Sequence, residues 1–98
     1  MDFEGFQWDD GNIQKCQKHG VSAAEIESIF SRRVLLIHDV MHSEIEQRYR
    51  AIGIAMSGRH IFVVFTMRGD WLRPLGARYM HKKEVRRYEK DNSDLHER

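Results

Sequence analysis

The residues best suited to chemistry are arginines and lysines that gather in the C-terminal third of the chain, between Arg68 and Tyr88. Residues 68–88 hold seven basic and two acidic groups, whereas residues 1–47 hold four basic and nine acidic groups. Eleven of the sixteen basic residues are arginine. Because the guanidinium fork matches phosphate oxygens and stacks on bases, this segregation of charge favours nucleic acid as the partner. A solvated charged surface without a ligand is the alternative.

A second group of cations precedes this segment. Arg48 and Arg50 point to the same face of an expected strand and flank Tyr49, an arrangement of charge and ring that suits phosphate and base contacts. Arg48 is equally suited to a structural ion pair with Glu46. The further side chains expected to bind RNA, together with Arg50, are His81, Lys82, Lys83 and Arg87.

Strand geometry limits how the arginines can converge. Arg73 and Arg78 differ by an odd number of positions, so their side chains point to opposite faces of an unbroken strand. They share a face only if a bulge near Pro74 or Gly76 shifts the pleat by one residue. Arg78 is also suited to an ion pair with Glu84, in which case its role is structural.

Glu84, Arg87 and Tyr88 fall along one side of an expected C-terminal helix, because they are three and four positions apart. Metal-free RNA cleavage needs a base for the 2′-hydroxyl, an acid for the leaving oxygen and cations around the phosphorane. Glutamate, tyrosine and arginine can supply these groups. Alternatively, Glu84 caps the helix from its N3 position, with His81 at the N-cap, and Tyr88 belongs to the core.

A metal or cofactor is not expected. His38, Asp39 and His42 form an H-D-x-x-H pattern that fits no strong zinc motif and has no cysteine pair beside it. The sequence contains no Walker A loop, dinucleotide-binding fingerprint or nucleophile elbow. His19 is expected to lie in the last turn of a helix, where positive charge is favourable, and Cys16 to be a small buried side chain.

The elements that must position these groups follow from hydrophobic periodicity and turn residues. The Asp9-Asp10 pair predicts a helix start, and Ser22 with Glu25 predicts a capping box. The expected order is a strand over 2–8, a helix over 11–19, a helix from 22, strands over 34–38, 47–56, 61–66 and 71–78, and a helix over 81–92.

This order predicts an α+β fold with an antiparallel sheet of about four to five strands, two N-terminal helices and one C-terminal helix. The helices are expected to cover one face, which leaves the other face for a ligand. The 98 residues are expected to form one domain, residues 1–98. The apolar runs are too short to span a membrane. The N-terminal residues do not resemble a signal peptide, so a cytoplasmic location is expected.

Several short motifs, spread over nearly the whole chain, match a known family. They include Trp8-Asp9, Lys18-His19-Gly20-Val21, Thr66-Met67-Arg68, Arg73-Pro74-Leu75 and Ala77-Arg78, with Glu84 and Tyr88 six and ten positions after Arg78. In these positions the chain resembles the BrnT toxins of bacterial type II toxin–antitoxin systems. The sequence departs from the family pattern at Gly76, where serine is more usual, and at His81, which replaces a hydroxyl N-cap.

The resemblance implies a RelE-like fold and a ribonuclease that inhibits translation without a metal. It also implies neutralisation by a ribbon-helix-helix (BrnA-like) antitoxin, which itself binds operator DNA. The residues that the resemblance assigns to RNA cleavage are Arg48, Arg68, Arg73, Arg78, Glu84 and Tyr88. Two alternatives stay open: a catalytically inactive toxin-like protein that acts through its antitoxin complex, and an interaction domain whose basic face meets an acidic protein.

Overall fold

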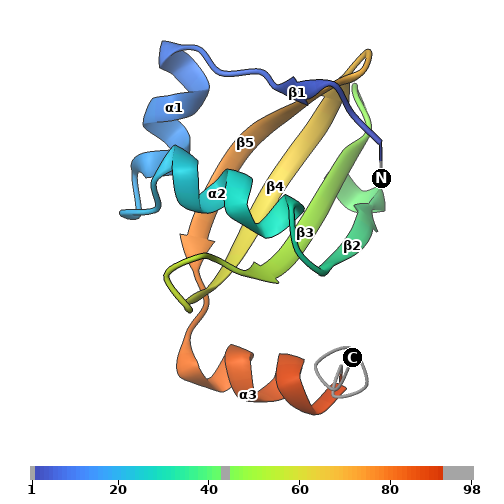
Figure 1. Cartoon of the computed structure of the whole chain (residues 1–98). Coiled ribbons are helices and arrows are strands. Elements are labelled where there is room, and N and C mark those ends of the chain that lie inside the picture. Colours follow the sequence, from blue (N-terminus) through green and yellow to red (C-terminus); the bar gives the residue numbers. More distant parts are fainter. Residues whose placement is uncertain (1, 43–44, 92–98) are drawn as a thin grey trace.

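The computed structural model describes residues 2–42 and 45–91 of the 98-residue chain. Two helices lie against a five-stranded sheet, and a third helix follows the last strand (Figure 1). Within the described residues, no helix is long and apolar enough to span a membrane. The elements are β1 (Gly5–Phe6), α1 (Asp10–Gln17), α2 (Ala23–Phe30), β2 (Val34–Asp39), a 3₁₀ turn (Val40–His42), β3 (Arg48–Ile54), β4 (His60–Arg68), β5 (Trp71–Tyr79) and α3 (Lys82–Asp91).

The predicted fold class and the order of strands and long helices are confirmed. Strands β2 to β5 form an antiparallel meander, and the sheet order is β1-β5-β4-β3-β2. One detail differs from the expectation of a purely antiparallel sheet, because β1 runs parallel to β5, with Gly5 opposite Trp71. The first strand is also shorter than expected. The expected end of the last helix at Asn92 lies outside the described residues.

Side-chain caps set where α1 and α2 begin. The Asp9 side chain accepts from the Asn12 N–H, and the Asn12 side chain accepts from the Asp9 N–H, which is a reciprocal capping box. Ser22 accepts from the Glu25 N–H at 3.1 Å, so it is the N-cap of α2 as predicted. Gly20, at φ +87°, turns the chain between the two helices in a conformation that glycine adopts without strain.

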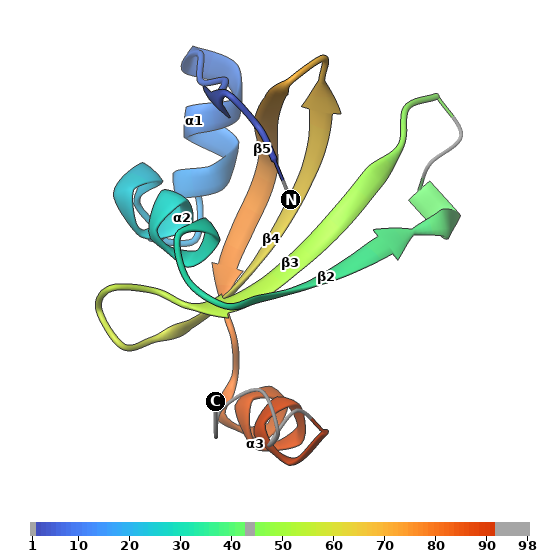
Figure 2. The same ribbon diagram turned by 45° about the vertical axis from the view of Figure 1, so that its right-hand side comes forward.

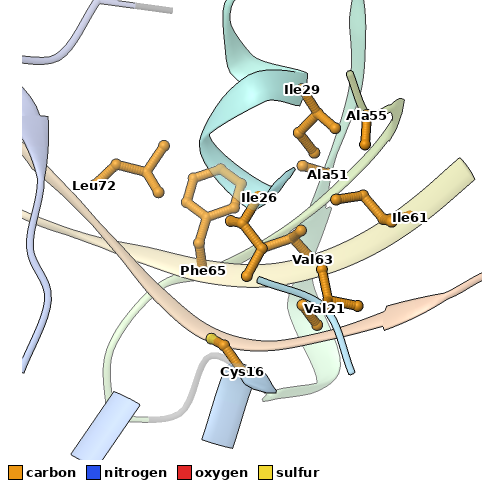
Figure 3. Close-up of a cluster of buried hydrophobic side chains, with 11 residues drawn as sticks. Cys16, Val21, Ile26, Ile29, Ala51, Ala55, Ile61, Val63, Phe65 and Leu72 are labelled. Carbon is orange, nitrogen blue, oxygen red and sulfur yellow. The ribbon is translucent and has the colours of Figure 1, made fainter. Parts of the chain in front are cut away.

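The core lies between these two helices and one face of the sheet (Figure 3). Ile26 and Ile29 of α2 pack with Ile61 and Phe65 of β4, and all four are fully buried. Burial of this apolar surface is the main source of stability in a domain of this size. Cys16 also belongs to the core, where burial raises the pKa of its thiol to about 11, so the thiol stays protonated and unreactive at neutral pH.

A bulge in β5 decides which of its side chains face the core. Val64 of β4 pairs with Gly76, but Phe65 pairs with Pro74, so Leu75 is an extra residue without a partner opposite it. The shift confirms the bulge that the sequence required. Arg73 and Arg78 therefore lie on the same face of the sheet, opposite the face that carries the buried residues Leu72 and Ala77.

Helix α3 lies beyond the C-terminal end of β5, apart from α1 and α2 (Figures 1 and 2). Its Tyr88 ring meets the His60 ring edge-on at a centroid distance of 5.6 Å. Glu89 of the same helix lies 3.4 Å from His60 Nε2. These contacts fasten α3 to the first residue of β4, next to the strands that carry the arginines.

Candidate functional site

The face of the sheet opposite the core, here called the open face, carries the basic side chains of β3 and β5. Its members follow from alternation: Ile61, Val63 and Phe65 point into the core, so Phe62 and Val64 point to the opposite side. Residues paired across strands share a face. The three rows of the open face are Arg48–Thr66–Arg73, Arg50–Val64–Gly76 and Ile52–Phe62–Arg78.

Phe62 is the aromatic centre of the open face. The Arg78 guanidinium carbon lies 4.9 Å from its ring centroid, and that of Arg50 lies 5.9 Å away. Both distances allow a cation–π contact. The sequence analysis treated Phe62 as part of an apolar strand and assigned it no role. Its alternation with the core residues Ile61 and Val63 was the signal that could have placed it beside the arginines.

Arg78 is held by Glu84. Its Nη1 donates to Glu84 Oε1 at 2.8 Å and its Nη2 donates to Oε2 at 2.9 Å, and both side chains are more than a third exposed. Glu84 Oε1 also accepts from the His81 N–H at 3.0 Å, so Glu84 caps α3 from the N3 position, as the alternative interpretation expected. Arg78, followed by this backbone hydrogen bond, lowers the pKa of Glu84 to about 2. Glu84 is therefore ionised and a weak base while the pair is closed.

Other arginines of the predicted site are paired with carboxylates too. The pairs are Arg73 Nη1 with Asp9 Oδ2 at 2.9 Å, Arg68 Nε with Glu46 Oε2 at 3.2 Å, and Arg50 Nε with Asp39 Oδ2 at 3.4 Å. The Arg68–Glu46 pair is largely exposed, and such pairs contribute only about 0–1 kcal/mol, so a bound phosphate could replace Glu46 at small cost. Asp39 is only 6% exposed, so its carboxylate is costly to leave without Arg50.

The arginines form a band and do not converge on one point. Arg78 lies opposite Phe62 and Arg68 lies at the other end of β4, six residues further along that strand. At about 3.3 Å per residue these positions are about 20 Å apart. Arg73, although it lies on the same face as Arg78, directs its guanidinium to Asp9 and Gln7 in the N-terminal segment. Such a band suits several successive phosphates of one strand.

The predicted site residues at the start of α3 and along it differ in their exposure to solvent. His81, Lys82 and Lys83 are exposed, and Arg87 is 87% exposed with its Nε 3.9 Å from Asp91 Oδ2. Tyr88 is only 7% exposed and packs on His60, as the core alternative expected. Burial is the main cause that raises the pKa of Tyr88, so its hydroxyl keeps its proton at neutral pH. Glu84, Arg87 and Tyr88 nevertheless border one pocket of about 290 Å³, together with Leu35, Ile52, Met80 and Asp91.

The described residues include no cluster of three potential metal ligands among His, Cys, Asp and Glu. The His38 ring lies tilted beside the Tyr49 ring at a centroid distance of 5.3 Å, on the core side, while Asp39 pairs with Arg50 on the open face. Consecutive strand residues point to opposite faces, so His38 and Asp39 do not approach a common ion. The side chain of His42, the third member of that pattern, lies outside the described part of the chain.

Comparison with known proteins gives one family match. The family model described as "Ribonuclease toxin, BrnT, of type II toxin-antitoxin system" matches residues 8–84, which is most of the chain. The matched segment begins at Trp8, before the Asp9 cap, and ends at Glu84, so it includes the whole open face. A search of curated proteins found no match.

Proposed function

The chain belongs to the BrnT family of ribonuclease toxins from type II toxin–antitoxin systems, and we propose that it inhibits translation by cleaving RNA without a metal ion. The cleavage proceeds by attack of a ribose 2′-hydroxyl on the adjacent phosphate. The P–O5′ bond breaks, and the leaving 5′ oxygen takes a proton from water. A 2′,3′-cyclic phosphate and a 5′-hydroxyl are the products.

The observation that carries this proposal is the arrangement of Arg50, Phe62 and Arg78 on the open face. Arginine binds phosphate through two parallel hydrogen bonds, and aromatic rings stack on the bases of single-stranded RNA. The open face offers both within one patch. Arg48 and Arg68 extend the basic band along β3 and β4, and His81, Lys82, Lys83 and Arg87 extend it onto α3.

In this mechanism a phosphate of the RNA takes the place of Glu84 on Arg78. Arg78 then stabilises the negative charge that grows on the phosphorane. Glu84 loses the main cause of its low pKa, so the pKa of its carboxylate rises toward the ordinary glutamate value and its basicity increases. The freed carboxylate accepts the proton of the attacking 2′-hydroxyl, while Tyr88 keeps α3 seated on His60.

The partner that neutralises the toxin is, in this proposal, a ribbon-helix-helix antitoxin, and operator DNA is bound only through that antitoxin. The family match places the chain in toxin–antitoxin systems, and in this proposal both proteins act in the cytoplasm. Co-expression with the neighbouring reading frame, followed by purification of the complex, tests this assignment. A toxin that is recovered alone from such cells, or a partner of another fold, contradicts it.

The cleavage proposal is tested by incubating the purified protein with 5′-labelled RNA in EDTA. We expect fragments that end in a 2′,3′-cyclic phosphate, and no fragments with Arg78→Ala. Lys18→Ala is the control, because it removes one exposed positive charge at the C-cap of α1 that is not among the predicted site residues. Fragments that appear equally with Arg78→Ala, or only when a divalent metal is added, contradict the proposal.

A second candidate function is a catalytically inactive toxin-like protein that acts through its antitoxin complex. The observation that favours it is the closed Arg78–Glu84 pair together with the burial of Tyr88, which leaves both proposed proton-transfer groups engaged. Salt-sensitive RNA binding without any cleavage, with or without ribosomes, selects this function over the first.

A further inference from the structure

A depression of about 200 Å³ lies where the end of α1 meets the open face at β5. We propose that it receives one unpaired base of an RNA strand whose phosphates follow the arginine band. The inference rests on the proposed RNA substrate and assigns the site a base-binding pocket. The depression is lined by Lys15, His19, Phe62, Val64, Gly76, Ala77 and Arg78.

The size of the depression suits a single ring system. Sites that enclose a drug-sized ligand measure about 300–1000 Å³, so 200 Å³ holds a base and not a whole nucleotide. Gly76 helps to keep this space empty. A Cβ built on Gly76 meets no atom within 4 Å, so the position beside the depression has room for added side-chain atoms.

The lining offers the contacts that a base needs. The Phe62 ring supplies an apolar surface, and the Arg78 guanidinium lies 4.9 Å from its centroid, so a base that enters beside them meets two flat groups. On the α1 side, Lys15 and His19 are exposed and can contact the phosphates that flank the base. The depression therefore combines a stacking surface with cations from two elements far apart in the sequence.

The contacts that hold α1 on the sheet are made by other α1 side chains than the one that lines the depression. Asn12 fixes the helix by donating to the carbonyl oxygens of Gln7 and Pro74, and Cys16 faces the core. Lys15 of α1 contributes to neither contact, and nor does His19, which follows the end of α1 at Gln17 and does not lie in its last turn as predicted. Filling the depression should accordingly leave the fold intact while changing what binds there.

The test compares binding of two short strands by fluorescence anisotropy. One is 2′-O-methyl RNA, which resists cleavage through its blocked 2′-oxygen, and the other carries the same phosphates with abasic spacers. We expect the strand with bases to bind about five-fold tighter or more, because one stacked base has an effect of this size. In Gly76→Val the advantage should disappear and the affinity should fall to that of the abasic strand.

Two further variants control for an effect of Gly76→Val on folding. Phe62→Leu keeps an apolar side chain but removes the ring, and should lose the same advantage. Lys18→Ala, outside the depression, should keep it. Equal binding of the two strands by the wild type overturns the inference, as does a folded Gly76→Val that binds like the wild type.

Cleavage assays on the same preparations separate this inference from the proposed function. RNA cleavage without any preference for bases overturns the pocket alone. A preference for bases that Gly76→Val removes, without cleavage, supports the pocket and overturns the ribonuclease activity. No binding of either strand overturns both.

Discussion

Arg78 and Glu84 are joined by two parallel hydrogen bonds of 2.8 and 2.9 Å, and the same carboxylate accepts the His81 N–H that begins α3. Glu84 thus caps α3 and also forms the ion pair with Arg78 on the open face. A phosphate that displaces Glu84 from Arg78 leaves the cap intact, because the His81 N–H still binds the carboxylate. A phosphate can therefore replace Glu84 on Arg78 while α3 keeps its N-terminal cap and its position.

Replacement of Glu84 by glutamine separates its two proposed roles. We expect Glu84→Gln to cleave RNA at least about 100-fold more slowly, since a positioned base contributes an effect of this size or more. Its affinity for uncleavable RNA should stay the same or increase, because Arg78 loses a charged competitor. Single-turnover cleavage rates and anisotropy titrations measure the two quantities. If Glu84→Gln cleaves as fast as the wild type, Glu84 is not the base, and its roles are only the helix cap and the ion pair.

The stability of the fold should depend on pH through Glu84. Its pKa is about 2 in the folded protein and near 4.5 without the interactions. The stabilisation is therefore complete above pH 5 and is lost as the pH falls toward 2. Because the pair is partly exposed, we expect only about 1 kcal/mol. Urea unfolding of the wild type and Glu84→Gln should show a difference at pH 6 that disappears near pH 2, and a difference of the same size at both pH values would contradict this role of Glu84.

The salt dependence of RNA binding should reveal which cations touch phosphate. For single strands, each phosphate contact contributes about 0.7 to the slope of log affinity against log salt. Arg50→Ala should lower that slope by about this amount and weaken binding by a similar factor for every sequence. Lys18→Ala should leave the slope unchanged. An unchanged slope in Arg50→Ala would exclude Arg50 from the phosphate contacts.

Asn12 should be among the most sensitive polar positions. It is 3% exposed, completes the capping box with Asp9 and donates to Gln7 O at 2.8 Å and Pro74 O at 3.0 Å. Asn12→Ala removes the side-chain donor to these two carbonyl groups and half of the cap, so we expect a loss of about 2–3 kcal/mol in unfolding free energy. Gln14→Ala, at an exposed position of the same helix, should change stability by less than about 0.5 kcal/mol.

Two glycines of the sheet should respond oppositely to alanine. A Cβ at Gly53 would lie 3.0 Å from Ile29 Cβ, against the packed helix α2, so Gly53→Ala should destabilise the fold by about 1–3 kcal/mol. A Cβ at Gly76 meets nothing, so Gly76→Ala should be neutral or stabilising, since alanine restricts the unfolded chain. Urea unfolding of the two variants checks this. A Gly76→Ala loss as large as that of Gly53→Ala would show that the depression is not open.

Local signals in the sequence determined most of the helices and strands, and they also indicated the bulge in β5. Asp9 and Ser22 start their helices as predicted, because capping depends on residues only three positions away. Strand parity required a bulge near Pro74 or Gly76 if Arg73 and Arg78 were to share a face, and the register shift beside Leu75 meets that condition. Both inferences use rules that act within a few residues.

Only the tertiary structure decided which groups meet. That Phe62 lies between Arg50 and Arg78, that Arg73 turns to Asp9, and that Lys15 and His19 border the depression at Gly76 all depend on strand register and helix docking. Contacts between residues so far apart in the chain are set by the packing of the whole core, which no local pattern encodes. The charge asymmetry indicated a polyanion, and the fold arranged that charge as a band on one face of the sheet.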